Sequence, residues 1–437
     1  MIIYNEFHDV EKPQVYHNKY GDYSDDIYCF DIETTNLFNI NGEWKQFDKS
    51  IKDYKDIDMA SCVYHCQFSI NDKVYGFRHI NELEDILKAI SNPMLCKVIW
   101  VHNLNFEFQH IIPILKKYTI TNMIARKSRM PICFHIEELN IDFRCSLRLT
   151  ELSLERSSEQ YTNVKKAKGD LDYNISRHPL TPLTEKEQYY CEMDCICLYE
   201  IIKYFRKQYK HVRSIPYTQT GRVRRAMKEI APKSHYEFIK QHTPTVEEYK
   251  LLSKYVFMGG ISHANPLHVR DYITKQHSFS KDIASSYPTQ MTTKRFPMDN
   301  FRKIKIENDN MYPMSHYCKI YDVILTAVKS KMYNHYISFS KCFDYENEYV
   351  DNGRLVSADK VHLIVTDVDY EMIKKCYRFD VETSEIKNIY VAKNDYLPKW
   401  MIQFILKNYG DKTKLKGIEG SEDIYLNAKQ IINCVYG

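Results

Sequence analysis

The sequence predicts a protein of mixed α/β and α+β class that is built from more than one domain. Its 437 residues exceed what a single hydrophobic core usually supports. Hydrophobic residues make up 44% and charged residues 27% of the chain, which is the balance of a folded globular protein. Strands and helices alternate over the first 110 residues, and a strand-rich stretch extends from about 300 to 396 before a final helical segment.

The first predicted elements are strands. The apolar segment 27–35 predicts a strand, and segments 61–70 and 73–80 predict a hairpin that turns at Asn71-Asp72. Segment 96–103 predicts a short buried strand that runs into a loop.

Two helices are predicted among these strands and after them. Segment 107–118 repeats its apolar residues with helical periodicity. Thr184 and Glu187 have the spacing of a capping box, in which each residue bonds a free backbone donor of the other. A long helix is therefore expected to begin there and to extend to about Tyr209.

The net charge directs attention to local clusters of cations. The 61 Lys and Arg residues exceed the 57 Asp and Glu residues by only +4, so any nucleic-acid site must come from clustering. Eight cations follow one another without an acid, at Arg206, Lys207, Lys210, Arg213, Arg222, Arg224, Arg225 and Lys228. With Tyr209 and Tyr217 interleaved, this basic stretch predicts a phosphate-contacting surface, although a solvated helix face has the same pattern. Pro216 and Gly221 make it the expected domain boundary.

Cysteine usage and hydropathy indicate a cytoplasmic protein. The 13 cysteines are scattered without a CxxC pair, and the tightest group, Cys191, Cys195 and Cys197, is expected to be reduced thiols rather than metal ligands. The first residues have no apolar signal-peptide core, and no apolar run approaches the roughly 18 residues of a membrane span.

Four carboxylates in the first half have the spacing of a metal site. Asp31 and Glu33 lie two apart on a predicted strand, so both side chains leave the same face. Glu107 follows a second strand, and Asp194 shares a helix face with Tyr190. Four such carboxylates repel one another unless cations neutralise them, as two Mg²⁺ ions about 4 Å apart would. The alternative is that they are ordinary surface acids.

Three motifs in this half resemble a known family. DIETT (31–35), HNLNFE (102–107) and YCEMD (190–194) look like the exonuclease motifs of DEDD-type 3′–5′ proofreading domains, which have an RNase H-like fold. Segments 145–149 and 168–173 resemble parts of this domain in protein-primed family B DNA polymerases. The family usually has Asp where this chain has Glu107, which leaves the metal geometry there open.

The resemblance implies a role for each matching residue. Asp31, Glu33, Glu107 and Asp194 would hold the metal ions, Tyr190 would orient the attacking water, and Lys168 would assist catalysis. The residues expected to hold the 3′ end of the substrate are Thr34, His102, Asn103, Phe106, Ser146 and Leu147.

The second half resembles the polymerase part of the same family. Segment 280–291, predicted as a strand ending at Asp282 before a helix, is similar to motif A, in which Asp282 would bind both catalytic metals and Tyr287 would lie under the sugar. The Gly259-Gly260 pair in FMGGIS resembles the linker that contacts template DNA.

KQIINCVYG (429–437) looks like motif B on a fingers helix. There Lys429 would meet the incoming triphosphate, and Asn433, Tyr436 and Gly437 would complete the nucleotide site. A lone Lys429 would be read as an exposed helical lysine, but the whole nonapeptide matches.

A third polymerase motif is expected to be absent. VTDVDY (365–370) resembles motif C, yet it precedes motif B and runs into a helical pattern, so we predict a strand-to-helix cap with Asp as the N-cap. The second insertion, motif C and the thumb are then missing. An incomplete gene record, a split gene, or an intron or intein would each account for this.

Together the motifs predict the N-terminal portion of a phage-type, protein-primed family B DNA polymerase. The expected parts are an exonuclease domain (1–215), a linker and first palm segment (216–300), palm strands (301–340), a terminal-protein-region insertion (341–398) and fingers (399–437). Expected ligands are Mg²⁺ (or Mn²⁺), primer-template DNA, single-stranded 3′ ends and dNTPs. Expected protein partners are a terminal primer protein and a C-terminal polymerase fragment acting in trans. The chain alone is predicted to be exonuclease-competent and polymerase-incomplete. A stand-alone DEDD nuclease and a non-catalytic DNA- or terminal-protein-binding remnant stay open as alternatives.

Overall fold

The computed structural model spans residues 1–437 and describes all of them except 1, 4–6, 41, 47–57, 168–170, 172–174, 261, 263–280, 284 and 437. The chain forms two compact units, Met1–Arg225 (unit 1) and Ala226–Gly437 (unit 2). Each unit contains one β-sheet with helices, which confirms the predicted mixed class with more than one domain. The division falls inside helix α6 (Gln219–Ile230), within the basic stretch. The finer division into five parts stays a prediction.

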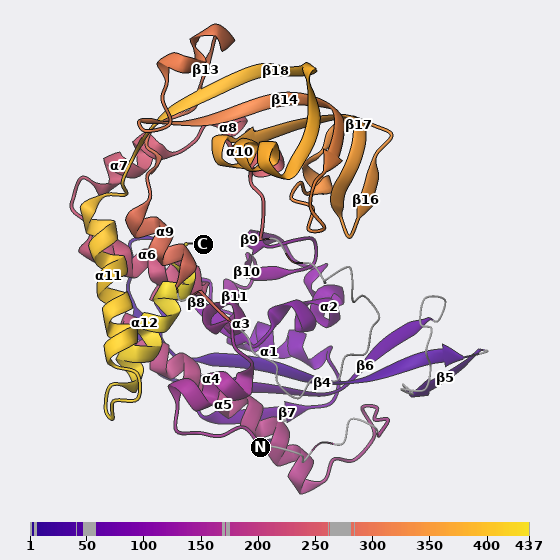
Figure 1. Ribbon diagram of the computed structural model, residues 1–437. Helices are drawn as coiled ribbons and strands as arrows, with labels where there is room; N and C mark the ends of the chain where they lie inside the picture. Colours follow the sequence, from indigo (N-terminus) through magenta and orange to yellow (C-terminus); the bar gives the residue numbers. More distant parts are fainter. Residues whose placement is uncertain are drawn as a thin grey trace. The chain divides into compact units, whose positions relative to one another are not determined.

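Unit 1 is organised around a sheet of eleven strands, whose main path runs in the order β1-β7-β6-β4-β8-β11-β10-β9 (Figure 1). Strands β4, β8 and β11 are parallel to one another, and β6 is antiparallel to β4. The strands are β1 (Ile2–Ile3), β2 (Val15–Tyr16), β3 (Asp22–Ser24), β4 (Tyr28–Ile40), β5 (Glu43–Gln46), β6 (Met59–Ile70), β7 (Lys73–Phe77), β8 (Leu95–Val101), β9 (Ile120–Ala125), β10 (Pro131–Ile136) and β11 (Ile141–Cys145).

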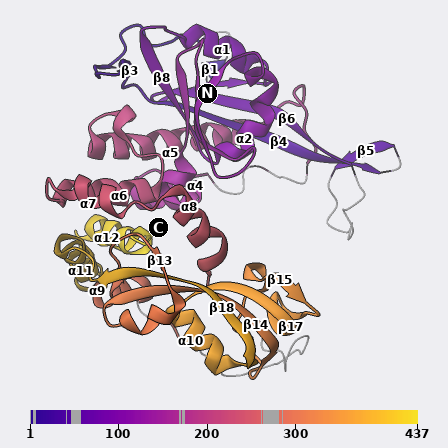
Figure 2. The same ribbon diagram turned by 90° about the horizontal axis from the view of Figure 1, so that it is seen from above.

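Helices cover both faces of this sheet, as its apolar parallel strands require. They are α1 (Glu82–Ile90), α2 (Leu104–Leu115), α3 (Ser146–Thr150), α4 (Leu154–Tyr161) and α5 (Glu185–Tyr209). Side chains alternate along β4, so that Tyr28 and Phe30 pack with α1 and α2 in one core. Ile27 and Cys29 pack with α4 and α5 in a second core. Figure 2 shows α1 and α5 on opposite sides of the sheet.

The local predictions for unit 1 are confirmed with small shifts. Strands β6 and β7 form the predicted hairpin, and Asn71 at its turn has a φ of 53°, which Asn tolerates well. Helix α2 begins at Leu104, three residues before the predicted segment, after Asn103 in the left-handed conformation. Helix α5 begins with the predicted capping box between Thr184 and Glu187.

The basic stretch differs from its prediction, because several of its cations pack inward. Arg222 is only 7% exposed, and its guanidinium lies 4.8 Å from the centre of the Phe205 ring. Arg225 donates to the carbonyl of Ser214 at 2.6 Å, whereas Arg224 is exposed. Assigning Arg222 to a phosphate-contacting surface is therefore wrong: aromatic rings on the neighbouring helix provide a cation–π site that a sequence pattern does not show.

Arg222→Ala is accordingly expected to reduce stability rather than DNA affinity. Loss of the buried stacking and of the bond to the Tyr161 hydroxyl (3.4 Å) should cost about 2 kcal/mol in unfolding free energy, as judged by urea denaturation. Arg224→Ala, on the exposed face of the same helix, is the matched control and should change unfolding by less than about 0.5 kcal/mol. Equal effects of the two substitutions on stability would contradict the buried role of Arg222.

Unit 2 contains a seven-stranded antiparallel sheet, in the predicted strand-rich region (Figure 1). Its main path is β12-β18-β14-β17-β15, with β13 beside β18 and β16 beside β17. The strands are β12 (Phe296–Pro297), β13 (Arg302–Ile304), β14 (Tyr317–Ser330), β15 (Phe343–Glu346), β16 (Tyr349–Asp351), β17 (Arg354–Thr366) and β18 (Tyr377–Asp395).

The helices of unit 2 divide between this sheet and a separate group. Helix α10 packs through Ile373 and Cys376 into the main core of the sheet, and a π-helical turn (Leu252–Val256) packs Val256 against Ile320 and Ile364. Helices α9, α11 and α12 contact one another. The helices after α6 are α7 (His235–His242), α8 (Val246–Leu251), α9 (Ser286–Thr293), α10 (Asp367–Cys376), α11 (Lys399–Lys414) and α12 (Glu422–Cys434).

Two further sequence expectations concern cysteines and membranes. None of the 13 cysteines forms a disulfide, and Cys191, Cys195 and Cys197 are fully buried. That they are reduced thiols rather than metal ligands stays a prediction. Within the described part of the chain, no helix combines the length and the apolar character that crossing a membrane requires.

Candidate active site

Three of the four predicted carboxylates meet in unit 1. Asp31 and Glu33 come from β4 and Asp194 from α5, and one ligand oxygen of each lies within 4.8 Å of the others. Residues 31 and 33 alternate in step with Ile27 and Cys29, so their side chains leave β4 on the face that α5 covers. The structure thus places the two strand acids on one face, as predicted, and shows which helix completes the group.

Glu107 lies beside this group rather than within it. It is in the first turn of α2 and is only 3% exposed. Burial raises the pKa of its carboxyl well above the usual range, and the charges of Asp31 and Glu33 raise it further. Its Oε2 atom is buried without a hydrogen-bond donor. Glu107 therefore lies close enough to Asp31 and Glu33 to feel their charges, and it reaches them from the first turn of α2.

Burial makes this group electrostatically unfavourable on its own. It raises the pKa of Asp31 to about 7, with the charge of Asp194 as the second cause, and it raises the pKa values of Glu33 and Asp194 as well. Gln67, opposite Asp31 on β6, donates to Asp31 Oδ2 at 2.9 Å. Asp194 Oδ1 is buried without a donor. Carboxylates with unused buried oxygens are suited to bind a hard divalent cation.

Lys166 is a residue of this site that the sequence reasoning missed. Its ammonium lies 2.8 Å from Asp194 Oδ2 and 5.0 Å from the centre of the Tyr190 ring. Lys168, to which the family resemblance assigned the catalytic role, lies outside the described residues. Three lysines occur at 165, 166 and 168, and nothing in their spacing selects the one that reaches the carboxylates.

If this group is the exonuclease site that the family resemblance implies, Lys166→Ala should slow removal of 3′-terminal nucleotides by about a hundredfold, because it removes a positive charge held against the carboxylates. The measurement is single-turnover cleavage of 5′-labelled DNA at saturating enzyme. Lys165→Ala, which removes a neighbouring exposed lysine, is the control and should leave the rate unchanged. A larger loss in the Lys165 variant would show that the wrong lysine has been assigned.

The residues expected to hold a 3′ end lie at the ends of two neighbouring strands. Val101, the last residue of β8, pairs with Cys145 of β11, which brings His102 and Ser146 together. The Ser146 Oγ atom lies 2.9 Å from His102 Nδ1, and burial lowers the pKa of His102 to about 4.

The remaining predicted contacts belong to the same region. Asn103 precedes α2 with a φ of 73°, and Phe106 in its first turn is 39% exposed. Leu147 packs at the edge of the core, and Thr34 follows Glu33 at an irregularity in β4.

In unit 2 the structure revises the surroundings of Asp282. The predicted strand ending there is wrong: residues 281–283 have no regular structure and Asp282 is exposed. The next residue, Ile283, is 76% exposed. Asp282 belongs to neither group of metal-ligating side chains found among the described residues.

The residues of motif B lie on one exposed face, as predicted. Helix α12 buries Ala428, Ile431 and Ile432, so that Lys429 and Asn433 point to the other side. The ring of Tyr436 stacks on Tyr287 with a centroid distance of 4.4 Å, which brings the two motifs together.

Three predicted positions of unit 2 are glycines. Gly437 is outside the described residues. Gly259 and Gly260 are exposed, and a Cβ on either would meet nothing within 4 Å.

The segment that resembles motif C is a strand-to-helix junction, as predicted, but Asp is not its N-cap. Thr366 caps α10 by accepting from the backbone N–H of Asp369 at 3.1 Å. Asp367 instead accepts from the backbone N–H of Lys319 at 3.0 Å, which fixes the helix to β14.

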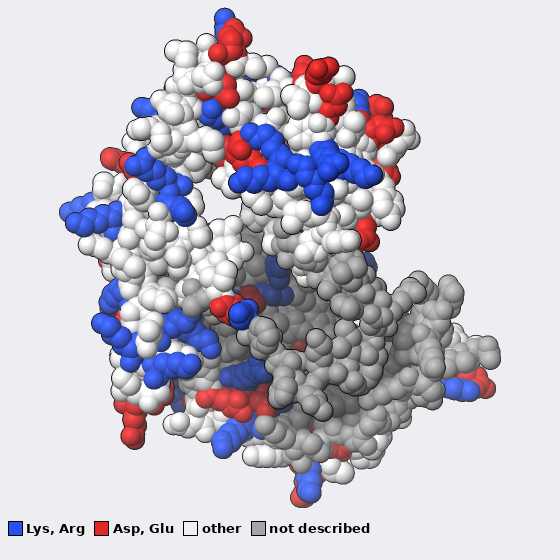
Figure 3. All heavy atoms as spheres, in the orientation of Figure 1, with Lys and Arg blue, Asp and Glu red and all other residues white. Residues whose placement is uncertain are grey.

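Exposed cations gather on unit 2 where the sequence showed no run. They come from the end of β14, the last turn of α10 and the start of β18, and are Lys329, Lys331, Lys374, Lys375 and Arg378. Lys331 Nζ donates to the carbonyls of Lys374 and Lys375 at 3.1 and 3.3 Å. Figure 3 shows Lys and Arg side chains gathered over the face where α10 lies in Figure 1.

Comparison with known proteins identifies the fold. No family model matches the chain, and no curated protein matches it. Solved structures do. The chain shares the fold of phi29 DNA polymerase. The similarity has a TM-score of 0.65 at 17% identity to an orthorhombic crystal form, and covers 94% of this chain and 67% of the phi29 chain.

Other phi29 structures match over the same shares of the two chains. The polymerase complexed with single-stranded DNA has a TM-score of 0.65 at 16% identity. The ternary complex with primer-template DNA and incoming nucleotide substrates has a TM-score of 0.61 at 17% identity.

Proposed function

We propose that these residues contain the 3′–5′ proofreading exonuclease, in unit 1, and part of the polymerase site, in unit 2, of a DNA-directed DNA polymerase of the protein-primed family B type. The observation that carries the proposal is the meeting of Asp31, Glu33 and Asp194 within 4.8 Å on a strand and a helix. The shared fold with phi29 DNA polymerase supports the polymerase assignment, since phi29 structures are complexed with primer-template DNA, single-stranded DNA and nucleotides.

The residues of unit 1 fit a divalent metal, for which Mg²⁺ is the proposed ion. The unused buried oxygens of Glu107 and Asp194 are the observation in favour, because such atoms need a positive partner. Asp31, Glu33, Asp194 and Glu107 would hold the ions. The metal would supply charge neutralisation and an activated water for cleavage of a phosphodiester.

The remaining side chains would position the reacting groups. The Tyr190 hydroxyl would orient the attacking water, and Lys166 would stabilise negative charge that develops on the phosphate. His102, Asn103 and Phe106 would hold the terminal nucleotide from α2, with Ser146 and Leu147 approaching from α3. Thr34 would contact it from β4.

In unit 2 we propose the nucleotide site of the polymerase at the junction of α9 and α12. Asp282 would bind metal, Lys429 the triphosphate, and Tyr287, Asn433 and Tyr436 the sugar and base. The contact between Tyr287 and Tyr436 supports this, because it joins two motifs that are 149 residues apart. We propose that the 341–398 insertion binds a terminal primer protein and that the enzyme works in the cytoplasm.

Two activities of residues 1–437 test the proposal separately. With Mg²⁺ and 5′-labelled single-stranded DNA, we expect stepwise shortening from the 3′ end and release of dNMPs. With primer-template and dNTPs we expect no extension, because within these residues Asp282 is the only proposed carboxylate of the polymerase metal site. No 3′ shortening would contradict the exonuclease assignment. Robust extension would contradict the assignment of one carboxylate to the polymerase site.

A further inference from the structure

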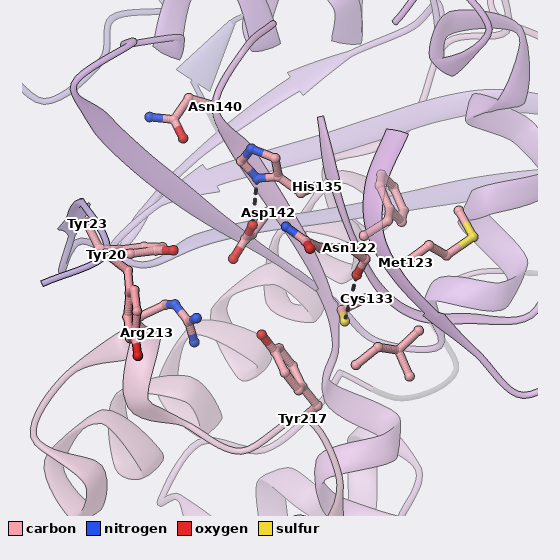
Figure 4. Close-up of a pocket in the computed structure, with 12 residues that line it drawn as sticks. Tyr20, Tyr23, Asn122, Met123, Cys133, His135, Asn140, Asp142, Arg213 and Tyr217 are labelled. Atoms are coloured by element: carbon pink, nitrogen blue, oxygen red, sulfur yellow. Dashed lines mark hydrogen bonds and ion pairs between the residues drawn. The ribbon is translucent and has the colours of Figure 1, made fainter. Parts of the chain in front are cut away.

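Unit 1 contains a pocket that takes no part in the proposed exonuclease site. Its volume is about 560 Å³, and Figure 4 shows the residues that line it, which come from β3, β9, β10, β11 and the segment before α6. Tyr23 pairs with Cys96 at the start of β8, whereas His102 follows the end of that strand. At about 3.3 Å per residue, these two ends are roughly 20 Å apart.

One wall of the pocket carries two guanidinium groups, Arg144 and Arg213, against one carboxylate, Asp142. Asp142 accepts from His135 Nδ1 at 2.8 Å and from Arg144 at 3.0 Å, so both of its oxygens are engaged. Arg213 forms no ion pair within 4 Å among the described residues, and its Nε atom is buried without an acceptor. Its guanidinium hydrogen-bonds with Tyr23, and this bond and the charge of Asp142 raise its pKa. Figure 4 shows Arg213, Tyr217 and Asp142 directed toward one another across the pocket. A guanidinium in this position favours an anion.

The other walls offer aromatic and amide groups. The guanidinium of Arg213 lies 5.0 Å from the centre of the Tyr23 ring, and that of Arg144 lies 4.8 Å from the centre of the Tyr217 ring. Arg144 also donates to the carbonyl of Arg213 at 3.1 Å, which fixes the segment that carries Arg213. Asn122 and Met123 form the opposite rim. Tyrosine rings beside an anion site and an amide suit a planar, hydrogen-bonding ring that carries a phosphate.

We propose that this pocket binds one mononucleotide unit, with its phosphate at Arg213 and its base among the tyrosines. The choice of a nucleotide rests on the proposed function, because a 3′–5′ exonuclease releases molecules of this class. The same chemistry is offered by a free nucleoside monophosphate and by the 5′-phosphorylated end of a strand. A volume of about 560 Å³ lies within the range of small-ligand pockets, about 300–1,000 Å³.

Binding is tested with the full chain carrying D31A and E33A, in EDTA, so that the exonuclease site contributes no metal-dependent binding. Equilibrium dialysis with radiolabelled dAMP should find one site. Deoxyadenosine and inorganic phosphate should each compete about tenfold or more weakly, because each lacks half of the contacts. Absence of dAMP binding would overturn the proposal.

Substitutions locate the site. R213Q should weaken dAMP binding by about tenfold or more, since a charge-assisted hydrogen bond is lost, while R156Q on the exposed side of α4 should not. If R213Q does not fold, M123E and M123K at the half-exposed rim decide, and only the acidic variant should weaken binding. Unchanged affinity in R213Q, or equal affinities of M123E and M123K, would overturn the assignment of the phosphate to Arg213.

Two competitors separate the possible sources of the ligand. If a 5′-phosphorylated oligonucleotide competes with dAMP and its 5′-hydroxyl counterpart does not, the pocket takes strand ends. If neither competes, it takes the free nucleotide. The dialysis does not use activity, so a wild-type chain without exonuclease activity that still binds dAMP through Arg213 would contradict the proposed function and leave the pocket intact.

Discussion

Replacing Asp31 and Glu33 with Ala is expected to lower 3′–5′ exonuclease activity by about a thousandfold or more, equivalent to about 4 kcal/mol of transition-state stabilisation. Both residues come from β4 and face α5, where Asp194 completes the group within 4.8 Å. Without the two strand acids, Asp194 and Glu107 remain on separate helices, too few to hold two ions. The measurement is release of labelled dNMP from a 3′ end in Mg²⁺.

The loss should not come from unfolding. Burial and mutual repulsion raise the pKa values of Asp31 and Glu33, so removing these carboxylates relieves an unfavourable interaction in the metal-free chain. The double variant should therefore unfold at the same temperature as the wild-type chain or a higher one. Glu159→Ala, which removes an exposed acid on α4, is the control for the assay.

The same experiment distinguishes nuclease activity of this site from that of a contaminating nuclease in the preparation. If the D31A/E33A preparation degrades DNA as fast as the wild type, the nuclease does not belong to this chain. If the double variant loses its activity and its fold together, the single variant Asp31→Asn, which keeps the volume and the bond from Gln67, replaces it.

The sequence predicted the elements of unit 1 well where local chemistry decides them. The capping box of Thr184 and Glu187 and the Asn71 turn depend on neighbours in the chain, and both formed as predicted. Asp31 and Glu33 followed from the two-residue repeat of a strand. The partners Gln67 and Lys166 could not be predicted. Gln67 meets Asp31 only because β6 pairs with β4, and Lys166 meets Asp194 only because the segment between α4 and α5 folds back to the site.

The failures have a common physical cause. Arg222 looked like a surface cation, but its environment is formed by the rings of Phe205 and Tyr161. Asp282 looked like the end of a strand, but residues 281–283 have no regular structure and Asp282 and Ile283 are exposed. The basic face of unit 2 joins residues about 45 positions apart through the pairing of β14 with β18, so no run of cations announced it. In each case contacts between residues far apart in the sequence decided the local structure or exposure, which the sequence pattern alone does not determine.

The metal-free chain is expected to lose thermal stability as the pH rises from 6.5 to 8.5, and Mg²⁺ is expected to restore it. The pKa of Asp31 is raised to about 7, and those of Glu33, Glu107 and Asp194 are raised as well. A carboxyl whose pKa is higher in the folded state binds protons more tightly there. Its contribution to stability is complete below the usual carboxyl pKa and is lost as the pH rises through the raised value.

The window above pH 6.5 isolates the carboxylates from the buried histidines. Burial lowers the pKa values of His65 and His102 to about 4, so these rings destabilise the fold only as the pH falls below their usual pKa. Above pH 6.5 both histidines are neutral in the folded chain, and they are mostly neutral in the unfolded chain as well. Burial also raises the pKa values of thiols in unit 1, among them Cys66, Cys191 and Cys195, which lower stability in the same direction near pH 8.5. The difference in melting temperature between the wild-type chain and a variant without the acids therefore reports on the acids.

Asp31, whose pKa is about 7, should by itself cost about 1 kcal/mol across this window, or roughly 3 °C, for the transition of unit 1 in EDTA by differential scanning calorimetry. The other raised carboxylates add to this loss in the same direction. Millimolar Mg²⁺ should remove most of it, because a cation replaces the protons that the carboxylates would otherwise need. The D31N/E33Q variant should show a smaller pH dependence, because Glu107 and Asp194 still titrate, and it should lose the Mg²⁺ effect, whereas Glu159→Gln should keep both in full. A wild-type melting temperature that stays constant or rises with pH, without metal, would mean that these four carboxylates are not held together in solution. The proposed metal site would then lose its physical basis.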